Sequence, residues 1–156
     1  MSLTFTDADF DRLSFHDCHL WGIAFGAGDS DAGDWTSDLT LDIDYIAEWL
    51  CGADGVTRFR VAPATLAFHG VTDPRVAIEW SFHGYQVALS PVSIDRIERE
   101  RLVDQKVYLD RPYYRWRVVA NAPAGGEITF GATGFDLTLR REPTLSDRQA
   151  LTRSRA

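Results

Sequence analysis

Residues 38–50 read DLTLDIDYIAEWL. The even positions are polar apart from Ile46 and the final Leu50, and the odd positions are apolar: Leu39, Leu41, Ile43, Tyr45, Ala47 and Trp49. In an extended chain these two sets point to opposite faces, whereas a helix would mix them. The pattern therefore predicts a strand with one face in the core and the other in water.

The same alternation recurs along the chain. It is visible at 76–82, 114–118, 128–130 and 135–139, and turns rich in Gly, Pro and Asp separate these segments. Segment 15–25 changes parity near Leu20, which predicts either a strand covered on both faces or a bulge. About eight strands in sequence predict a mainly β fold, an antiparallel sandwich or curled meander.

Four segments are less regular. Parity flips at Pro63, which indicates two short strands or one edge strand broken at the proline. Residues 93–103, SIDRIERERLV, fit a helix or a charged edge strand, and the alternating Arg and Glu favour the strand. Residues 131–134 form either a hairpin turn or a kink in one long strand. After Pro143, residues 147–154 are predicted to form a short C-terminal helix, capped by Thr144 or Ser146.

Length and composition favour a single domain. The chain has 156 residues and a mass of 17.5 kDa, so we expect one domain over residues 1–156. No apolar run approaches the roughly 20 residues of a membrane span, and no export signal is visible. The missing export signal favours free, buried thiols at Cys18 and Cys51, and the predicted location is the cytoplasm.

Charge is distributed unevenly. The net charge is −7, and residues 1–50 carry −10, residues 51–110 carry −1 and residues 111–156 carry +4. Either Arg115, Arg117 and Arg140 neutralise the acidic third within the fold, or the acidic face stays open and attracts a basic protein. A chain with so few basic patches is not expected to bind nucleic acid.

Reactive residue types cluster at residues 16–19, HDCH. A metal site would use His16, Cys18 and His19, and the same residues could instead form the Cys–His pair of a thiol enzyme. A strand places at most two such ligands on each face, so further ligands would have to come from His69 and His83. The alternative is a buried cysteine beside histidines that bond locally.

Carboxylates offer two further candidates. Asp29, Asp31 and Asp34 have the oxygen-rich spacing that suits calcium, but the twelfth position of an EF-hand loop would be Thr40, so an acidic hairpin loop is favoured. Asp42 and Asp44 share a strand face as a glycosidase-type pair would, but we expect that face to be wet. The phosphate-binding glycine motifs are missing from the sequence, and no cofactor is expected.

One aromatic and basic loop is a candidate contact for a partner. Tyr113 is its central residue, and its other members are Tyr108, Arg111, Pro112 and Tyr114. Tyr and Arg together are favoured at protein interfaces, and the competing interpretation is a packed strand end.

Three strings carry a resemblance: LSFHDCHLWGIAF (13–25), DLTLDIDYIAEW (38–49) and YRWRVVANAPAGGEITFGATGFDLTLRREPTLSDRQAL (114–151). Together they resemble a group of small uncharacterised bacterial β-rich proteins. The opening His-Asp strand is also similar to immunity proteins of bacterial toxin systems. That similarity implies a cytoplasmic single domain that binds and blocks a toxin, with His16 and Asp17 as the matching residues.

These observations predict a non-enzymatic binding protein. Its basic protein partner would meet an acidic face made of Asp38, Asp42 and Asp44, near the loop at 29–34, with Tyr113 as a further contact. The alternative is a metal- or thiol-dependent enzyme built on residues 16–19.

Overall fold

The computed structural model describes residues 3–80, 89–103 and 110–151. Within them, ten strands form one antiparallel sheet with two short 3-10 helices, so the predicted mainly β class is confirmed. The strands are β1 (Thr4–Thr6), β2 (His19–Ala27), β3 (Ser37–Cys51), β4 (Thr57–His69), β5 (Thr72–Ala77), β6 (Val92–Arg101), β7 (Tyr114–Ala122), β8 (Glu127–Ala132), β9 (Gly134–Leu139) and β10 (Thr144–Ser146); the helices are η1 (Asp7–Arg12) and η2 (Ser30–Ala32).

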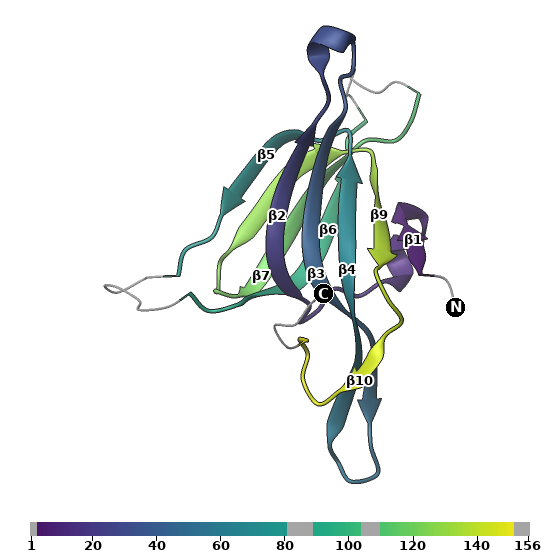
Figure 1. Cartoon of the computed structure of the whole chain (residues 1–156). Coiled ribbons are helices and arrows are strands. Elements are labelled where there is room, and N and C mark those ends of the chain that lie inside the picture. The colour runs from purple at the N-terminus through teal and green to yellow at the C-terminus, as the bar shows by residue number, and fades with distance from the viewer. Residues whose placement is uncertain (1–2, 81–88, 104–109, 152–156) are drawn as a thin grey trace.

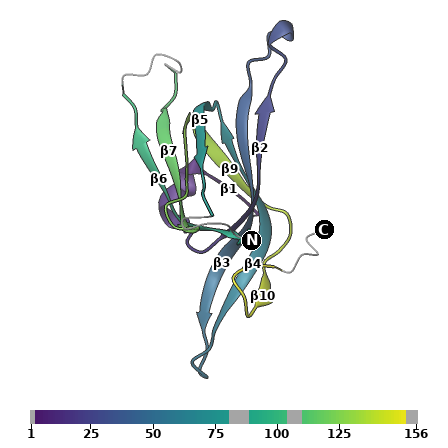
Figure 2. The same ribbon diagram turned by 90° about the vertical axis from the view of Figure 1, so that its left-hand side faces the viewer.

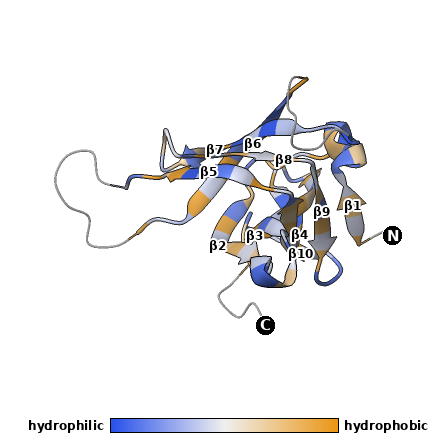
Figure 3. Ribbon diagram, turned by 90° about the horizontal axis from the view of Figure 1, so that it is seen from above, coloured by the Kyte–Doolittle hydropathy of each residue, from blue (hydrophilic) through white to orange (hydrophobic). Residues whose placement is uncertain are grey.

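The sheet curls so that its two halves face each other. Its strand order is β1-β9-β4-β3-β2-β6-β7-β8-β5, with β10 beside β4. Seen from above, β5 to β8 lie in one layer and β1 to β4 with β9 lie in the other (Figure 3). The layers join where β2 pairs with β6 through only His19 and Leu20. β8 runs into β9 through Thr133, so residues 131–134 are a kink in one long strand.

The core fills the space between the two halves. Leu39, Leu41 and Ile43 of β3 are fully buried, as their shared parity predicts. Register shifts near Leu20 in β2 and between Ile46 and Glu48 in β3, so the bulge expected in segment 15–25 is present and a second one follows in β3. These bulges rotate the following side chains out of the alternating pattern.

Two hairpins extend beyond the layers at opposite ends. β2 and β3 project at the top of Figure 1, with η2 at the tip, and β3 and β4 project at the bottom beside β10. The side view shows the β2–β3 hairpin standing apart from β6 and β7 (Figure 2). Residues near the top tip therefore have no opposite layer to pack against.

The structure corrects the expectation at Pro63. β4 continues through this residue, and the Pro63 carbonyl accepts the Arg140 N–H at 2.8 Å. The N–H and C=O of an antiparallel residue point to the same side, so the missing N–H faces Arg140 and not β3. A proline at this point breaks no bond of the β3–β4 ladder.

The predicted C-terminal helix is also wrong for the residues described. β10 pairs with β4, and residues 147–151 follow it as bends without a helix. Tertiary contacts hold this tail against the sheet, because the Leu151 N–H reaches Asp44 and the Gln149 side chain reaches Asp17. Residues 152–154 lie outside the described part, as do Phe82, His83 and Tyr108.

Segment 93–103 matches the favoured interpretation. β6 pairs with β7 along its length and with β2 only at one end, so most of it is a charged edge strand. Among the described residues, no helix has the length and apolar character needed to cross a membrane.

Candidate functional site

The strand aspartates are engaged inside the fold. The Asp42 carboxylate accepts a hydrogen bond from the Arg140 guanidinium at 2.8 Å, and Asp38 lies 3.4 Å from Nδ1 of His69. Both carboxylates are partly exposed. The face is therefore acidic only in part, because an arginine from the C-terminal third neutralises Asp42.

Asp44 does not lie on a wet face. It is 0% exposed, and its Oδ2 accepts hydrogen bonds from Nε1 of Trp21 at 2.8 Å and from the Leu151 N–H at 2.9 Å. This burial corrects the expectation that Asp44 contacts a partner. Instead it fastens the C-terminal tail to β2 and β3, and it forms no accessible carboxylate pair with Asp42.

Tyr113 is likewise buried, at 3% exposed. Its hydroxyl group bonds with Thr72, and its ring edge lies against Gly131, where a Cβ would collide with it. The packed strand end is thus the correct interpretation of this loop, and a partner docking on the surface does not reach Tyr113.

Residues 16–19 do not converge on a metal. The His16 ring stacks on Trp49, with centroids 6.1 Å apart, while the His19 ring stacks on Trp21. Nδ1 of His19 is buried without a hydrogen-bond partner in the described part of the structure. Across residues 3–80, 89–103 and 110–151, no three His, Cys, Asp or Glu side chains are arranged to hold a metal ion.

Asp17 has a structural role. Its two carboxylate oxygens accept hydrogen bonds from Asn121 at 2.7 Å and from Gln149 at 2.8 Å. His16 lies beside it, with Nε2 3.5 Å from Asp17 and Nδ1 3.4 Å from Asp95. The His-Asp pair therefore ties β2, β6, β7 and the tail together where the two layers meet.

Cys18 is unsuited to nucleophilic chemistry. It is 0% exposed, and its sulfur accepts the Ile46 N–H at 3.5 Å. The pKa of the Cys18 thiol is raised to about 12, chiefly by burial; the Ile46 N–H lowers it, and the carboxylates of Asp17 and Asp44 raise it by smaller amounts. The thiolate that a thiol enzyme needs is therefore absent at neutral pH.

We expect thiol labelling to distinguish the two cysteines. Cys18 is buried as expected, but Cys51 is exposed, which corrects the expectation of two buried thiols. A maleimide at pH 8 should therefore modify Cys51 alone in the folded protein and both residues in guanidinium chloride. Mass spectrometry of the labelled peptides gives the answer. Fast labelling of Cys18 in the folded protein would restore the thiol-enzyme interpretation.

The tip of the β2–β3 hairpin carries three exposed acids. The Asp29 side chain caps η2 by accepting the Asp31 N–H, and Asp34 accepts both the N–H and the hydroxyl of Thr36. The bonds from Thr36 lower the pKa of Asp34. The carboxylates thus shape an acidic loop, as favoured over a calcium site.

Two large aromatic side chains accompany these acids in the open. Trp35 is 79% exposed and Phe25 is 62% exposed. The sequence carries no Lys or Arg between Arg12 and Arg58. We call residues 25–38 the acidic arm.

No sequence pattern singled out Phe25 or Trp35 as exposed. Phe25 pairs with the buried Leu39 of β3 and is nevertheless 62% exposed. The β2–β3 hairpin stands apart from β6 and β7 (Figure 2). A tryptophan within a Gly- and Asp-rich turn was the signal available for Trp35.

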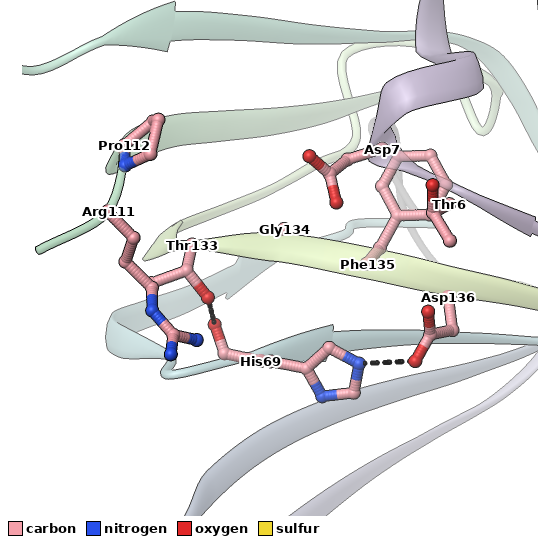
Figure 4. Close-up of a pocket in the computed structure, with 9 residues that line it drawn as sticks. All are labelled: Thr6, Asp7, His69, Arg111, Pro112, Thr133, Gly134, Phe135 and Asp136. Atoms are coloured by element: carbon pink, nitrogen blue, oxygen red, sulfur yellow. Dashed lines mark hydrogen bonds and ion pairs between the residues drawn. The ribbon is translucent and has the colours of Figure 1, made fainter.

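A polar cavity of about 420 Å³ lies near the kink between β8 and β9 (Figure 4). His69 contributes to its wall, with Nε2 2.9 Å from Asp136 and Nδ1 facing Asp38. Thr133 donates its hydroxyl to the His69 carbonyl oxygen. Since carboxylates occupy both ring nitrogens and the hydroxyl points elsewhere, these residues form no nucleophile and base pair.

No family model, curated protein or solved structure matches this chain. Function has to follow from the geometry and charge of its own residues. Among the features described, the acidic arm combines exposure, charge of one sign and large apolar side chains.

Proposed function

We propose that this chain is a non-enzymatic binding protein that engages a basic protein partner through the acidic arm. The observation that carries the proposal is the exposure of Trp35 and Phe25 beside Asp29, Asp31 and Asp34 on a hairpin that projects from both layers. Carboxylates speed encounter with a basic surface, and aromatic side chains supply affinity once water is excluded.

The arm takes over the role first assigned to the strand aspartates. Asp38 lies at its base and is partly exposed, so it extends the negative surface. No described ion pair involves the three tip acids, whereas Asp42 has Arg140 within 2.8 Å. A cation on a partner therefore finds uncompensated charge at the tip.

The proposed setting is the cytoplasm, and the proposed role is that of an immunity-like antagonist. An exposed thiol such as Cys51 stays reduced in the cytoplasm. The similarity of the His-Asp strand to immunity proteins favours a toxin as the basic partner. An acidic inhibitor that covers a basic active surface would use this chemistry.

Affinity capture with a charge-matched pair of variants tests the proposal. The arm variant carries D29N, D31N and D34N, and the control variant carries D54N, E100Q and E142Q, three exposed acids outside the arm. We expect wild type and control to retain one basic polypeptide from a lysate of the native host, and the arm variant to lose it.

Salt provides the second readout. Raising the ionic strength from about 0.15 M to about 1 M shortens the Debye length from about 8 Å to about 3 Å, so the captured polypeptide should elute. Capture of nucleic acid alone, or equal capture by both variants, would contradict the proposal.

A further inference from the structure

β2 has an unpaired edge that begins where β6 leaves it. β6 pairs with β2 only at His19 and Leu20. Pro91 lies just before β6 and lacks the N–H that would continue this ladder. Among the described residues, no strand pairs with this side of β2 beyond Leu20, although β2 extends to Ala27.

The hydrogen bonds between β2 and β3 show which backbone groups of β2 face outward. The Gly28 N–H donates to the Thr36 carbonyl at 2.8 Å, and these residues are direct cross-strand partners in the register that runs down from Ala27. Bonded and non-bonded pairs alternate in an antiparallel ladder. The residues of β2 that bond β3 are therefore even-numbered, and those with outward N–H and C=O groups are Ile23, Phe25 and Ala27.

This edge lacks the protection seen at other edges of the sheet. Residues 20–28, LWGIAFGAG, contain neither a charge nor a proline. β5 carries Asp73, Pro74 and Arg75, and the open part of β6 alternates Arg and Glu. Natural sheets use such charges and prolines to prevent strand addition, so their absence leaves β2 receptive.

The two faces beside the edge differ in chemistry. Ile23 and Phe25 share a face with the core-facing residues of β3. On the other face, Gly26 lies beside Asp38, and Gly22 also lacks a side chain. A strand added to β2 would lie two strand spacings, about 10 Å, from β3. A Lys or Arg of the added strand is long enough to reach Asp38, because Gly22 and Gly26 have no side chains in the way.

We propose that the β2 edge binds an extended segment of the partner as an added antiparallel or parallel strand. The segment alternates apolar residues, over Ile23 and Phe25, with Lys or Arg on the opposite face. This inference rests on the proposed function and specifies how the partner binds. A second copy is the less suitable occupant, because β2 itself carries no Lys or Arg that could reach Asp38.

A synthetic peptide provides the direct test. The probe is a short capped peptide of alternating valine and lysine, and the control peptide is the same with every backbone nitrogen methylated, which removes the donors of both edges and keeps the charge. In the protein alone, the amides of Ile23, Phe25 and Ala27 should exchange rapidly. The unmodified peptide should protect them, while the methylated peptide should bind at least about tenfold more weakly.

A backbone variant tests the same edge from the protein side. A27P removes one outward N–H, which spares the bonds to β3, and A27S is the matched control that keeps it. We expect A27P to bind the peptide about fivefold more weakly than A27S, the equivalent of one hydrogen bond. The methylated-peptide comparison needs only the wild-type protein, so a folding defect in A27P does not remove the test.

The outcomes separate this inference from the proposed function. Equal binding of both peptides that still depends on Asp29, Asp31 and Asp34 overturns strand addition and leaves the basic-partner proposal standing. No binding of either peptide overturns strand addition, and the lysate capture then decides the basic partner independently. Slow amide exchange in the protein alone, or a dimer in sedimentation that A27P disrupts, means that the edge is already occupied and overturns the inference.

Discussion

Replacing Trp116 with alanine should lower the free energy of unfolding by about 4 kcal/mol, as large core deletions do. Trp116 is 0% exposed and lies at the centre of an aromatic cluster, with ring centroids 5.2 Å from Phe68, 5.4 Å from Phe10 and 5.7 Å from Phe135. These partners come from β4, η1 and β9, so the side chain bridges the two layers. Urea unfolding followed by circular dichroism measures the loss.

W116F separates cavity formation from the loss of a polar contact. Nε1 of Trp116 donates to the Ala132 carbonyl at 3.2 Å, and phenylalanine keeps most of the ring contacts while it removes this side-chain hydrogen bond. We expect W116F to lose less than half as much stability as W116A. Equal losses would show that the hydrogen bond, and not packing between the layers, dominates at this position.

The predictable part of the fold was the part governed by local alternation. Leu39, Leu41 and Ile43 follow the period of two and all lie in the core. Asp44 follows the same period on the polar side and is nevertheless buried, because Leu151 and Trp21 cover it. The contact between Leu151 and Asp44 spans 107 residues of sequence, so a local pattern cannot predict it. The burial of Asp44 therefore became apparent only in the structure.

Charge pairing depended on strand register, which the sequence does not reveal. Of the three C-terminal arginines considered, Arg140 reaches Asp42, whereas Arg117 pairs with Glu98 and Glu127 on its neighbouring strands. β7 lies between β6 and β8, so its outward side chains meet acids of the same layer. Both charge arrangements are thus partly realised: one strand aspartate is neutralised, and the tip of the hairpin is not.

The sequence predicted the acidic residues of the acidic arm but not the exposure of its aromatic residues. Asp29, Asp31 and Asp34 were recognised as an acidic hairpin loop, since hairpin tips tolerate Gly and Asp. The exposure of Phe25 depends on how far β2 and β3 run past the opposite layer. How far a hairpin extends past the neighbouring strands is a property of the tertiary structure. Alternation alone assigns every second residue to the inward face, including residues near the tip that no other layer covers.

Stability should fall steeply with rising pH above about 9. Burial raises the pKa of the Cys18 thiol from about 9 to about 12 and that of the Tyr45 hydroxyl from about 10 to about 12. Between these values the unfolded chain has lost protons that the folded chain keeps, so the unfolded state binds fewer protons and folding weakens with pH. Each group contributes at most about 1.4 kcal/mol per pH unit.

The variant C18A isolates the thiol part of this slope. Alanine cannot titrate, so the free energy of unfolding of C18A should decline less between pH 9 and pH 10, where the Cys18 thiol contributes more to the slope than Tyr45 does, even though the small cavity lowers stability at every pH. C51A is the matched control, because that thiol is exposed and its removal should leave the slope unchanged. The slope of urea-derived stability against pH is therefore the readout, and parallel curves for C18A and wild type would mean that the Cys18 thiol ionises alike in both states.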